Sequence, residues 1–221
     1  MNMVELEQQV VSKQRVTDHG EVFTNKREVN AMLDLVKQET ERIESRFLEP
    51  ACGTGNFLTE ILERKLQVVA GRYGKVQLEY ERNAVLAISS IYGVDILEDN
   101  IQECCDRLFA IFNQRYNQLF GDLTSDRCRD AVRFILGRNI IHGDALTLKT
   151  VGNEPQPIVF AEWSPVDGSL LKRRDFNFKG LLECESMNQL PLFSDQGDDV
   201  FIPEPVRDYP LVHFLEVGNA Q

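Results

Sequence analysis

The feature that most constrains the fold is an alternation of short apolar segments with amphipathic segments between residues 46 and 163. The apolar segments have the length and composition of buried strands, and they cover residues 47–48, 91–96, 139–144 and 157–163. Between and beside them, apolar residues recur at helical spacing over residues 57–66, 79–89, 98–119 and 125–136. Strands that alternate with helices favour an α/β fold, in which a mostly parallel sheet is covered by helices on both faces.

The two ends of the chain differ from this central region. Asn25 and Glu28 match a capping box, which predicts a helix ahead of the first strand. After residue 183 the sequence becomes acidic and rich in Pro and Gly, with one late strand candidate at residues 211–217. We therefore expect an N-terminal helical segment (1–45), an α/β domain (46–183) and an irregular acidic C-terminal arm (184–221).

The formal net charge of −11 argues against tight, unaided binding to DNA. Affinity for nucleic acid comes largely from Lys and Arg side chains that neutralise phosphates. A local basic face remains an alternative, and its densest candidate is Lys172-Arg173-Arg174. A solvated surface is the more common explanation of such a cluster.

Cysteine usage and hydropathy give expectations about compartment. The five cysteines form no CxxC pair, which favours reduced thiols in a cytoplasmic protein and argues against a zinc site. No apolar run approaches the ~20 residues of a membrane span, and the polar N-terminus does not resemble a signal peptide. We expect a cytoplasmic protein without a membrane segment or a metal.

A loop of small residues joins the first predicted strand to the helix that begins near Phe57. Gly53 and Gly55 would let the main chain pass close to a ligand, near the positive end of the helix dipole. The dinucleotide fingerprint is incomplete because the third glycine is missing, and no G-K-[ST] follows as in a phosphate loop. An ordinary tight turn also explains a G-x-G spacing.

Three carboxylates strengthen the ligand hypothesis, because Glu49, Asp95 and Asp144 each end a predicted strand. The carboxyl ends of parallel strands share one edge of the sheet, where ligands bind in such folds. Asp95 would accept hydrogen bonds from ribose hydroxyls, Asp144 from an exocyclic amine, and Ile96 would pack on an adenine ring. One such acid alone is also typical of a cap or loop. Together with the loop, the three predict a site for an adenosine ligand without a phosphate anchor.

Several stretches resemble the motifs of one enzyme family. "LEPACGTGNFLTEIL" resembles the first motif of S-adenosylmethionine-dependent DNA methyltransferases of the restriction-modification type, which modify the exocyclic amine of adenine. "GEVFTNKREVNAML", "IYGVDILEDNIQECCDRL" and "NIIHGDAL" resemble three further motifs, in the same order. The resemblance covers roughly residues 20–165. It implies a truncated, class I methyltransferase-like (Rossmann-like) sheet that binds S-adenosylmethionine.

The resemblance also implies a role for each matching residue. Phe23 and Thr24 would line the methionine end of the cofactor, and Asp95 would hold its ribose. The remaining positions that the resemblance assigns to cofactor binding are Glu49, Ala51, Gly53, Gly55, Ile96 and Asp144. Asn25 stands where the family usually has proline.

The catalytic motif of that family is missing. Family members carry [N/D/S]-P-P-[Y/F/W] after the fourth strand, where it positions a flipped-out base. This chain has Glu162-Trp163-Ser164-Pro165 instead. In one interpretation these residues form a divergent catalytic loop, in which Glu162 or Ser164 accepts from the amine and Trp163 stacks on the base. In the other, Trp163 is a packed aromatic residue and the loop is not catalytic.

Two main functional hypotheses follow from the resemblance. The first is a DNA adenine methyltransferase homologue associated with restriction-modification or phage defence, with DNA as its substrate. The alternative is a catalytically inactive, cofactor-binding subunit or regulator. A methyltransferase that acts on protein or a small molecule is a third possibility. The expected sheet lacks strands and a target-recognition domain, which the C-terminal arm, a protein partner or a second copy would have to supply.

Overall fold

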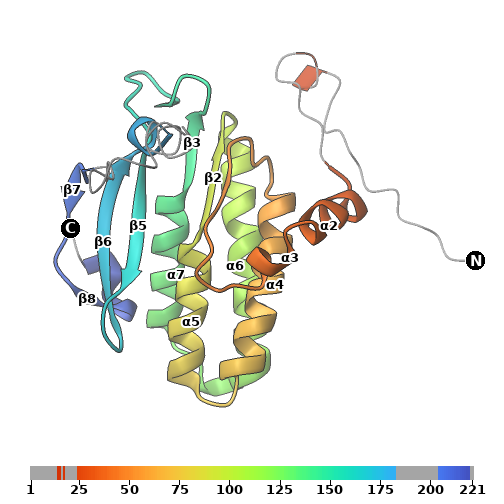
Figure 1. Cartoon of the computed structure of the whole chain (residues 1–221), viewed down its shortest axis with the longest axis vertical. Helices are drawn as coiled ribbons and strands as arrows, with labels where there is room; N and C mark the ends of the chain where they lie inside the picture. Colours follow the sequence, from red (N-terminus) through yellow and green to blue (C-terminus); the bar gives the residue numbers. More distant parts are fainter. Residues whose placement is uncertain (1–13, 16, 18–23, 183–203, 220–221) are drawn as a thin grey trace, which may run out of the picture.

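The computed structural model describes residues 14–15, 17, 24–182 and 204–219, and it is a mixed α/β fold (Figure 1). Its helices are α2 (Lys26–Asp34), α3 (Lys37–Thr40), α4 (Asn56–Tyr73), α5 (Gln77–Ser89), α6 (Glu98–Phe120) and α7 (Asp126–Asn139), with 3₁₀ turns η1 (Gly121–Leu123) and η3 (Phe214–Asn219). Its strands are β1 (Phe47–Glu49), β2 (Ile91–Asp95), β3 (Ile140–Asp144), β4 (Lys149–Thr150), β5 (Val159–Pro165), β6 (Leu170–Asn177), β7 (Arg207–Asp208) and β8 (Val212–His213).

The mostly parallel sheet is confirmed. Its strand order is β1-β2-β3-β4, with β1, β2 and β3 parallel and β4 antiparallel to β3. All five residues of β2 are buried, which explains why the central strand is an apolar run rather than an alternating pattern. The helix predicted at residues 79–89 is α5, which lies between the glycine loop and β2 and lengthens that connection.

The helices pack as neighbours beside this sheet, with α4 against α5 and α6, and α7 against α5 and α6. Each buries one apolar stripe at helical spacing, such as Leu58, Leu62 and Leu66 of α4. Asn25 is the N-cap of α2, as predicted, and its side chain accepts a hydrogen bond from the Arg27 N–H, 2.9 Å.

The predicted fourth strand of the parallel sheet is wrong. β5 pairs antiparallel with β6 rather than with β1, β2 or β3. It also runs opposite to β3, because Ile158 reaches Gly143 near the end of β3 while Trp163 donates to Asn139, just before its start (3.0 Å) (Figure 1). A local hairpin turn at Gly168, with φ +51°, lets β6 pair with β5 directly. The sequence analysis did not identify β6.

The second face of the parallel sheet is covered differently from the prediction of helices on both faces. Tyr92 and Val94 of β2 pack with Ile158 and Phe160 of the hairpin segment, and with Phe178. The Tyr92 hydroxyl donates to the Ala161 carbonyl, 3.0 Å, and so joins the two sheets. This face is therefore covered by the β5–β6 hairpin and by the helical residues 178–182 that follow it.

The prediction of an irregular C-terminal arm is wrong for residues 204–219. β7 and β8 both pair antiparallel with β6. Phe214 and Val217 are buried in the main core, and η3 packs on α7. β8 lies within the strand candidate at residues 211–217, although most of that stretch forms η3, whereas β7, with two residues, is too short for a periodic pattern to predict. Residues 184–203 of the predicted arm lie outside the described residues.

None of the helices in the described ranges combines the length and the apolar character that a membrane span needs. Within the same ranges, no three His, Cys, Asp or Glu side chains form a metal-binding group. Four described cysteines are free thiols: Cys52, Cys104, Cys105 and Cys128.

Candidate functional site at the carboxyl edge of the parallel sheet

The strand register brings the three predicted carboxylates to one edge. Glu49 of β1 lies opposite Gly93, and Asp95 lies two residues further along β2, opposite His142 of β3. Asp144 lies a further two residues along β3. Side chains alternate between faces along a strand, so this stepping by two places all three acids on the same face of the sheet.

The glycine loop is shaped by backbone and packing requirements. Gly53 and Gly55 have φ values of +52° and +85°, in the left-handed region that favours glycine. A Cβ at Gly55 would lie 2.6 Å from the Cys104 Sγ of α6, which is far inside contact distance. A hydrogen bond with Cys104 and, after it, burial raise the pKa of the Cys52 thiol, so the loop cysteine stays protonated. Gly55 therefore allows α4 and α6 to approach, whether or not a ligand binds.

Asp95 connects this loop to the end of β2. Its carboxylate accepts hydrogen bonds from the Gly53 N–H (2.8 Å), the Leu97 N–H (2.9 Å) and the Asn100 Nδ2 (3.2 Å). A carboxylate offers about four acceptor positions, so these three donors leave little capacity. A ligand that donates two hydroxyl groups to Asp95 must displace at least one of them, and the Gly53 N–H is the one contributed by the loop.

Arg107 of α6 holds the other side of the loop. Its Nη1 donates to the Thr54 carbonyl (2.7 Å), the Thr54 hydroxyl (3.0 Å) and the Asn56 Oδ1 (2.9 Å). Asn56 in turn donates through Nδ2 to the Thr24 carbonyl, 3.1 Å. The segment ahead of α2 is thereby attached to the start of α4, beside the glycine loop.

A second attachment of the N-terminal segment involves Arg15. Its Nη1 forms an ion pair with Asp99 at 2.5 Å, and its Nη2 donates to the Asn100 Oδ1 at 3.1 Å. Asn100 is also a partner of Asp95. Arg15 and Thr24 thus lie against the first turns of α6 and α4, the two helices that flank the loop.

The remaining predicted binding residues lie at the same edge. Partial burial raises the pKa of Glu49, and the hydrogen bond from the Ala51 N–H opposes this rise. Asp144 accepts from the Leu146 N–H and the Thr147 hydroxyl, both 2.9 Å, and these bonds lower its pKa. Ile96 is 45% exposed, so its side chain can cover an apolar ligand group. Phe23 lies outside the described residues.

Glu162, Trp163, Ser164 and Pro165 do not lie with these residues. They belong to β5, whose end lies near the beginning of β3 rather than at its carboxyl edge. Trp163 is 4% exposed and packs edge-on against Phe134. This geometry supports the interpretation of Trp163 as a packed aromatic residue.

The Glu162 carboxylate already accepts hydrogen bonds from three neighbouring side chains. It accepts from Arg46 (2.6 Å), Ser164 (2.8 Å) and Arg174 (2.9 Å). Burial alone would raise the pKa of Glu162, but the Ser164 hydroxyl and the Arg46 guanidinium outweigh it and hold that pKa below its usual value. A carboxylate held in this way is poorly suited to accept a proton or orient a substrate amine.

The basic cluster at residues 172–174 is paired as well. Lys172 forms an ion pair with Asp208, Arg173 with Asp175 at 2.8 Å, and Arg174 with Glu162 at 2.8 Å. Charges neutralised by neighbouring carboxylates contribute little to phosphate binding. This cluster therefore gives no support to a DNA-binding face.

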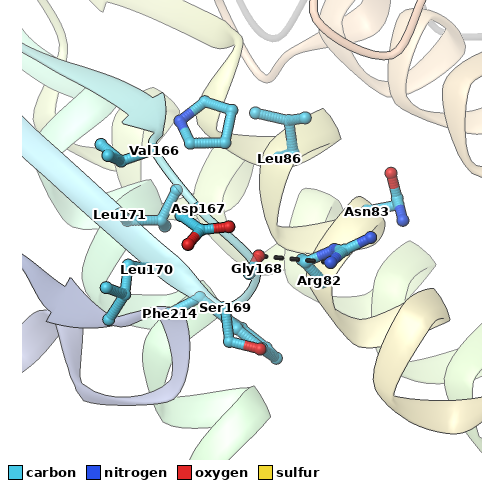
Figure 2. A pocket seen from close by; sticks show the side chains of 11 residues that line it. Arg82, Asn83, Leu86, Val166, Asp167, Gly168, Ser169, Leu170, Leu171 and Phe214 are labelled. Carbon is cyan, nitrogen blue, oxygen red and sulfur yellow. Dashed lines mark hydrogen bonds between the residues drawn. The ribbon is translucent and has the colours of Figure 1, made fainter.

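A cavity of about 280 Å³ lies between α5 and the turn of the β5–β6 hairpin, away from the carboxyl edge (Figures 1 and 2). Arg82 points into it, but its guanidinium donates to the Gly168 carbonyl (3.2 Å) and pairs with Glu79 (2.5 Å). Arg82 thus ties the hairpin turn to α5. Pro165 is the predicted site residue among those that line this cavity.

The sequence analysis missed five side chains that hold the candidate site together: Arg15, Thr54, Asn56, Asn100 and Arg107. Asn100 lies in the first turn of α6, five residues after Asp95, and this closeness in sequence is a weak signal for contact. Arg107 lies on a helix in a pattern typical of solvated surface, so only the packing of α6 against the loop identifies its role.

Comparisons of the chain with protein-family models, curated proteins and solved structures give no match. The functional proposal therefore depends on the geometry of the carboxyl edge.

Proposed function

We propose that this chain is a class I methyltransferase-like module that binds S-adenosylmethionine at the carboxyl edge of its parallel sheet. The observation that carries the proposal is the register of β1, β2 and β3, which aligns Glu49, Asp95 and Asp144 on one face beside the left-handed loop. Any parallel sheet brings strand-end acids to one edge, but this register also places all three on the same face, as the resemblance in motif order predicts.

The donor and acceptor groups at the edge fit the proposed ligand. Asp95 would hold the ribose, Ile96 and Asp144 would contact the adenine, and the loop from Glu49 to Gly55 would lie under the amino-acid portion. S-adenosylmethionine carries a sulfonium and an ammonium, and an edge with three carboxylates complements positive charge. When bound, this cofactor supplies an electrophilic methyl group.

The module is proposed to lack methyl-transfer chemistry of its own. Glu162 is held by Arg46, Arg174 and Ser164, and Trp163 is packed against Phe134. A catalytic loop would have to come from a partner chain, as in a subunit or regulator of a restriction-modification or defence complex. The cation pairing at residues 172–174 likewise favours DNA recognition by a partner.

Calorimetric titration with S-adenosylmethionine and S-adenosylhomocysteine tests this proposal. We expect binding by the wild-type protein and by the control Asp106→Asn, whose carboxylate accepts from Gln102 on an exposed face of α6. Asp95→Asn should weaken binding by about 1–3 kcal/mol, since a neutral amide is a poorer partner for ribose hydroxyls. If neither ligand gives a heat of binding at millimolar concentration, the proposal is refuted.

A second candidate is a working DNA adenine methyltransferase. It is favoured by the attachment of Thr24 to Asn56, since the resemblance implies that the N-terminal motif packs over the methionine end of the cofactor. Transfer of a tritiated methyl group to DNA by the purified chain alone would support it. Transfer that requires an added neighbouring protein would instead support the subunit hypothesis.

A further inference from the structure

Asn100 lies between two charged groups of opposite sign. The residue is 3% exposed, and its Nδ2 donates to the Asp95 carboxylate at 3.2 Å. On its other side, its Oδ1 accepts from the Arg15 guanidinium at 3.1 Å. The Asn100 side chain therefore links the N-terminal segment directly to the carboxylate that is proposed to hold ribose.

The chemistry of these groups fixes the orientation of the amide. A guanidinium has only donors and an ionised carboxylate has only acceptors. A rotation of the Asn100 amide by half a turn would set its NH₂ against Arg15 and its oxygen against Asp95, so both hydrogen bonds would become repulsive contacts. Arg15 thereby holds the NH₂ group of Asn100 toward Asp95.

Arg15 is itself held in place by Asp99. The two form an ion pair at 2.5 Å, and this hydrogen bond is the main reason why the pKa of Asp99 lies below its usual value. The order of contacts is Asp99, Arg15, Asn100 and then Asp95. Arg15 adds to the hold that the Asp95 carboxylate itself has on the Asn100 amide, so loss of Arg15 should weaken this donor on Oδ1.

We propose that Arg15 and Asn100 are positioning residues for Asp95, through which the segment ahead of α2 sets selectivity for the ribose hydroxyls of an adenosine ligand. This inference rests on the proposed function. The Leu97 N–H and the Asn100 NH₂ both donate to Oδ1, so the Gly53 N–H on Oδ2 is the bond that ligand hydroxyls would replace. We call the contacts from Arg15 through Asn100 to Asp95 the relay. Loss of the relay should lower the affinity only for ligands that carry the two ribose hydroxyls.

The test compares adenosine with 2′,3′-dideoxyadenosine, which lacks both ribose hydroxyls. Calorimetry of the wild-type protein should show a preference for adenosine of about tenfold or more, as expected for hydrogen bonds to a charged acceptor. Arg15→Met and Asn100→Ala should each reduce that preference several-fold and leave the affinity for dideoxyadenosine unchanged. Arg15→Lys keeps a donor for Asn100 and should retain most of the preference.

Arg127→Met is the matched control, because it removes a different, exposed ion pair, which Arg127 forms with Glu216. Thermal melting of each variant checks that the fold is intact. A preference that Arg15→Met and Asn100→Ala both leave unchanged would overturn the relay alone. Failure of the wild-type protein to bind adenosine or S-adenosylhomocysteine at all would overturn both the relay and the proposed function.

Discussion

The carboxyl edge of β1–β3 and the β5–β6 hairpin both carry clustered charges, but they use them differently. In the hairpin, every charged side chain of the 172–174 cluster pairs with a carboxylate, and Arg173 meets Asp175 through two 2.8 Å hydrogen bonds. At the edge, Asp144 and Asp95 accept from neutral backbone and side-chain donors, so their negative charge is not cancelled by a direct cation. The number of charged residues in a stretch of sequence does not show whether their charges are paired with opposite charges or held by neutral donors.

Under the proposed function, the hairpin charges serve stability and the edge charges serve binding. A buried charge is stable only when it is paired and hydrogen-bonded, and the hairpin meets that condition internally. Carboxylates held by neutral donors keep an electric field that a cationic ligand can complement. Point substitutions in each region test this division.

The largest effect is expected from Arg173→Met in the hairpin. The change leaves Asp175, which is 8% exposed, without its guanidinium partner, and breaking a buried pair in this way costs about 3–5 kcal/mol. Urea denaturation measures the free energy of unfolding. Lys172→Met is the control, because its partner Asp208 is exposed and such pairs contribute about 0–1 kcal/mol. Equal losses in both variants would contradict the assignment of Arg173 to a structural role.

Gly55→Ala should destabilise the edge by about 1–3 kcal/mol. The new methyl group meets the Cys104 Sγ, and the left-handed φ is strained for any residue with a Cβ. Gly137→Ala is the control, because this glycine lies within α7 with open space around it. Since glycine weakens a helix interior, that change should stabilise the protein by about 0.5–1 kcal/mol. Thermal melting that shifts both variants in the same direction would refute the prediction.

Arg107→Met should weaken binding of S-adenosylhomocysteine by about 1–3 kcal/mol, because the loop loses three hydrogen bonds from one guanidinium. Arg133→Met provides a comparison, since Arg133 pairs with Asp130 on the surface of α7. Calorimetry should detect the loss only in the Arg107 variant. An Arg107→Met protein with wild-type affinity would show that the loop does not need this support.

The smallest expected effect is a change with pH in the affinity for S-adenosylmethionine, caused by the titration of Glu49. Burial raises its pKa, so the folded protein retains a proton there at pH values where a free glutamate is ionised. A cationic ligand favours the ionised form, and affinity for S-adenosylmethionine should therefore rise as pH increases through this raised pKa. Titrations from about pH 5 to about pH 7 measure the change. Glu49→Gln should remove this part of the dependence, and an unchanged pH profile would exclude Glu49 from the site.

The sequence predictions were accurate for the parallel sheet with its helices and less accurate for the hairpin region. Every strand and helix predicted between residues 46 and 144 is present, because each has a strong period, but α4 continues to Tyr73, beyond the end predicted at residue 66. Beyond residue 144 the chain pairs with itself through hairpins. The prediction for β5 was wrong in direction because nothing local specifies whether an apolar run pairs parallel or antiparallel.

The positions of the candidate-site carboxylates could be predicted from the sequence, but the contacts that support them could not. The edge position of Glu49, Asp95 and Asp144 follows from strand order and was expected. The supporting contacts of Arg107 and Asn100 were not, because they depend on the packing of α6 against residues about 50 positions earlier or on an amide orientation. Long-range contacts of this kind have no period in the sequence.

The most direct test of the account compares one carboxylate from each region in the same titration. S-adenosylhomocysteine is titrated into the wild-type protein, Asp95→Asn and Glu162→Gln, and unfolding free energies are measured in parallel. We expect Asp95→Asn to lose about tenfold or more in affinity, whereas Glu162→Gln, which weakens the contacts with Arg46 and Arg174, should retain wild-type affinity. Loss of affinity in Glu162→Gln with Asp95→Asn unaffected would place the ligand at the hairpin and contradict the account.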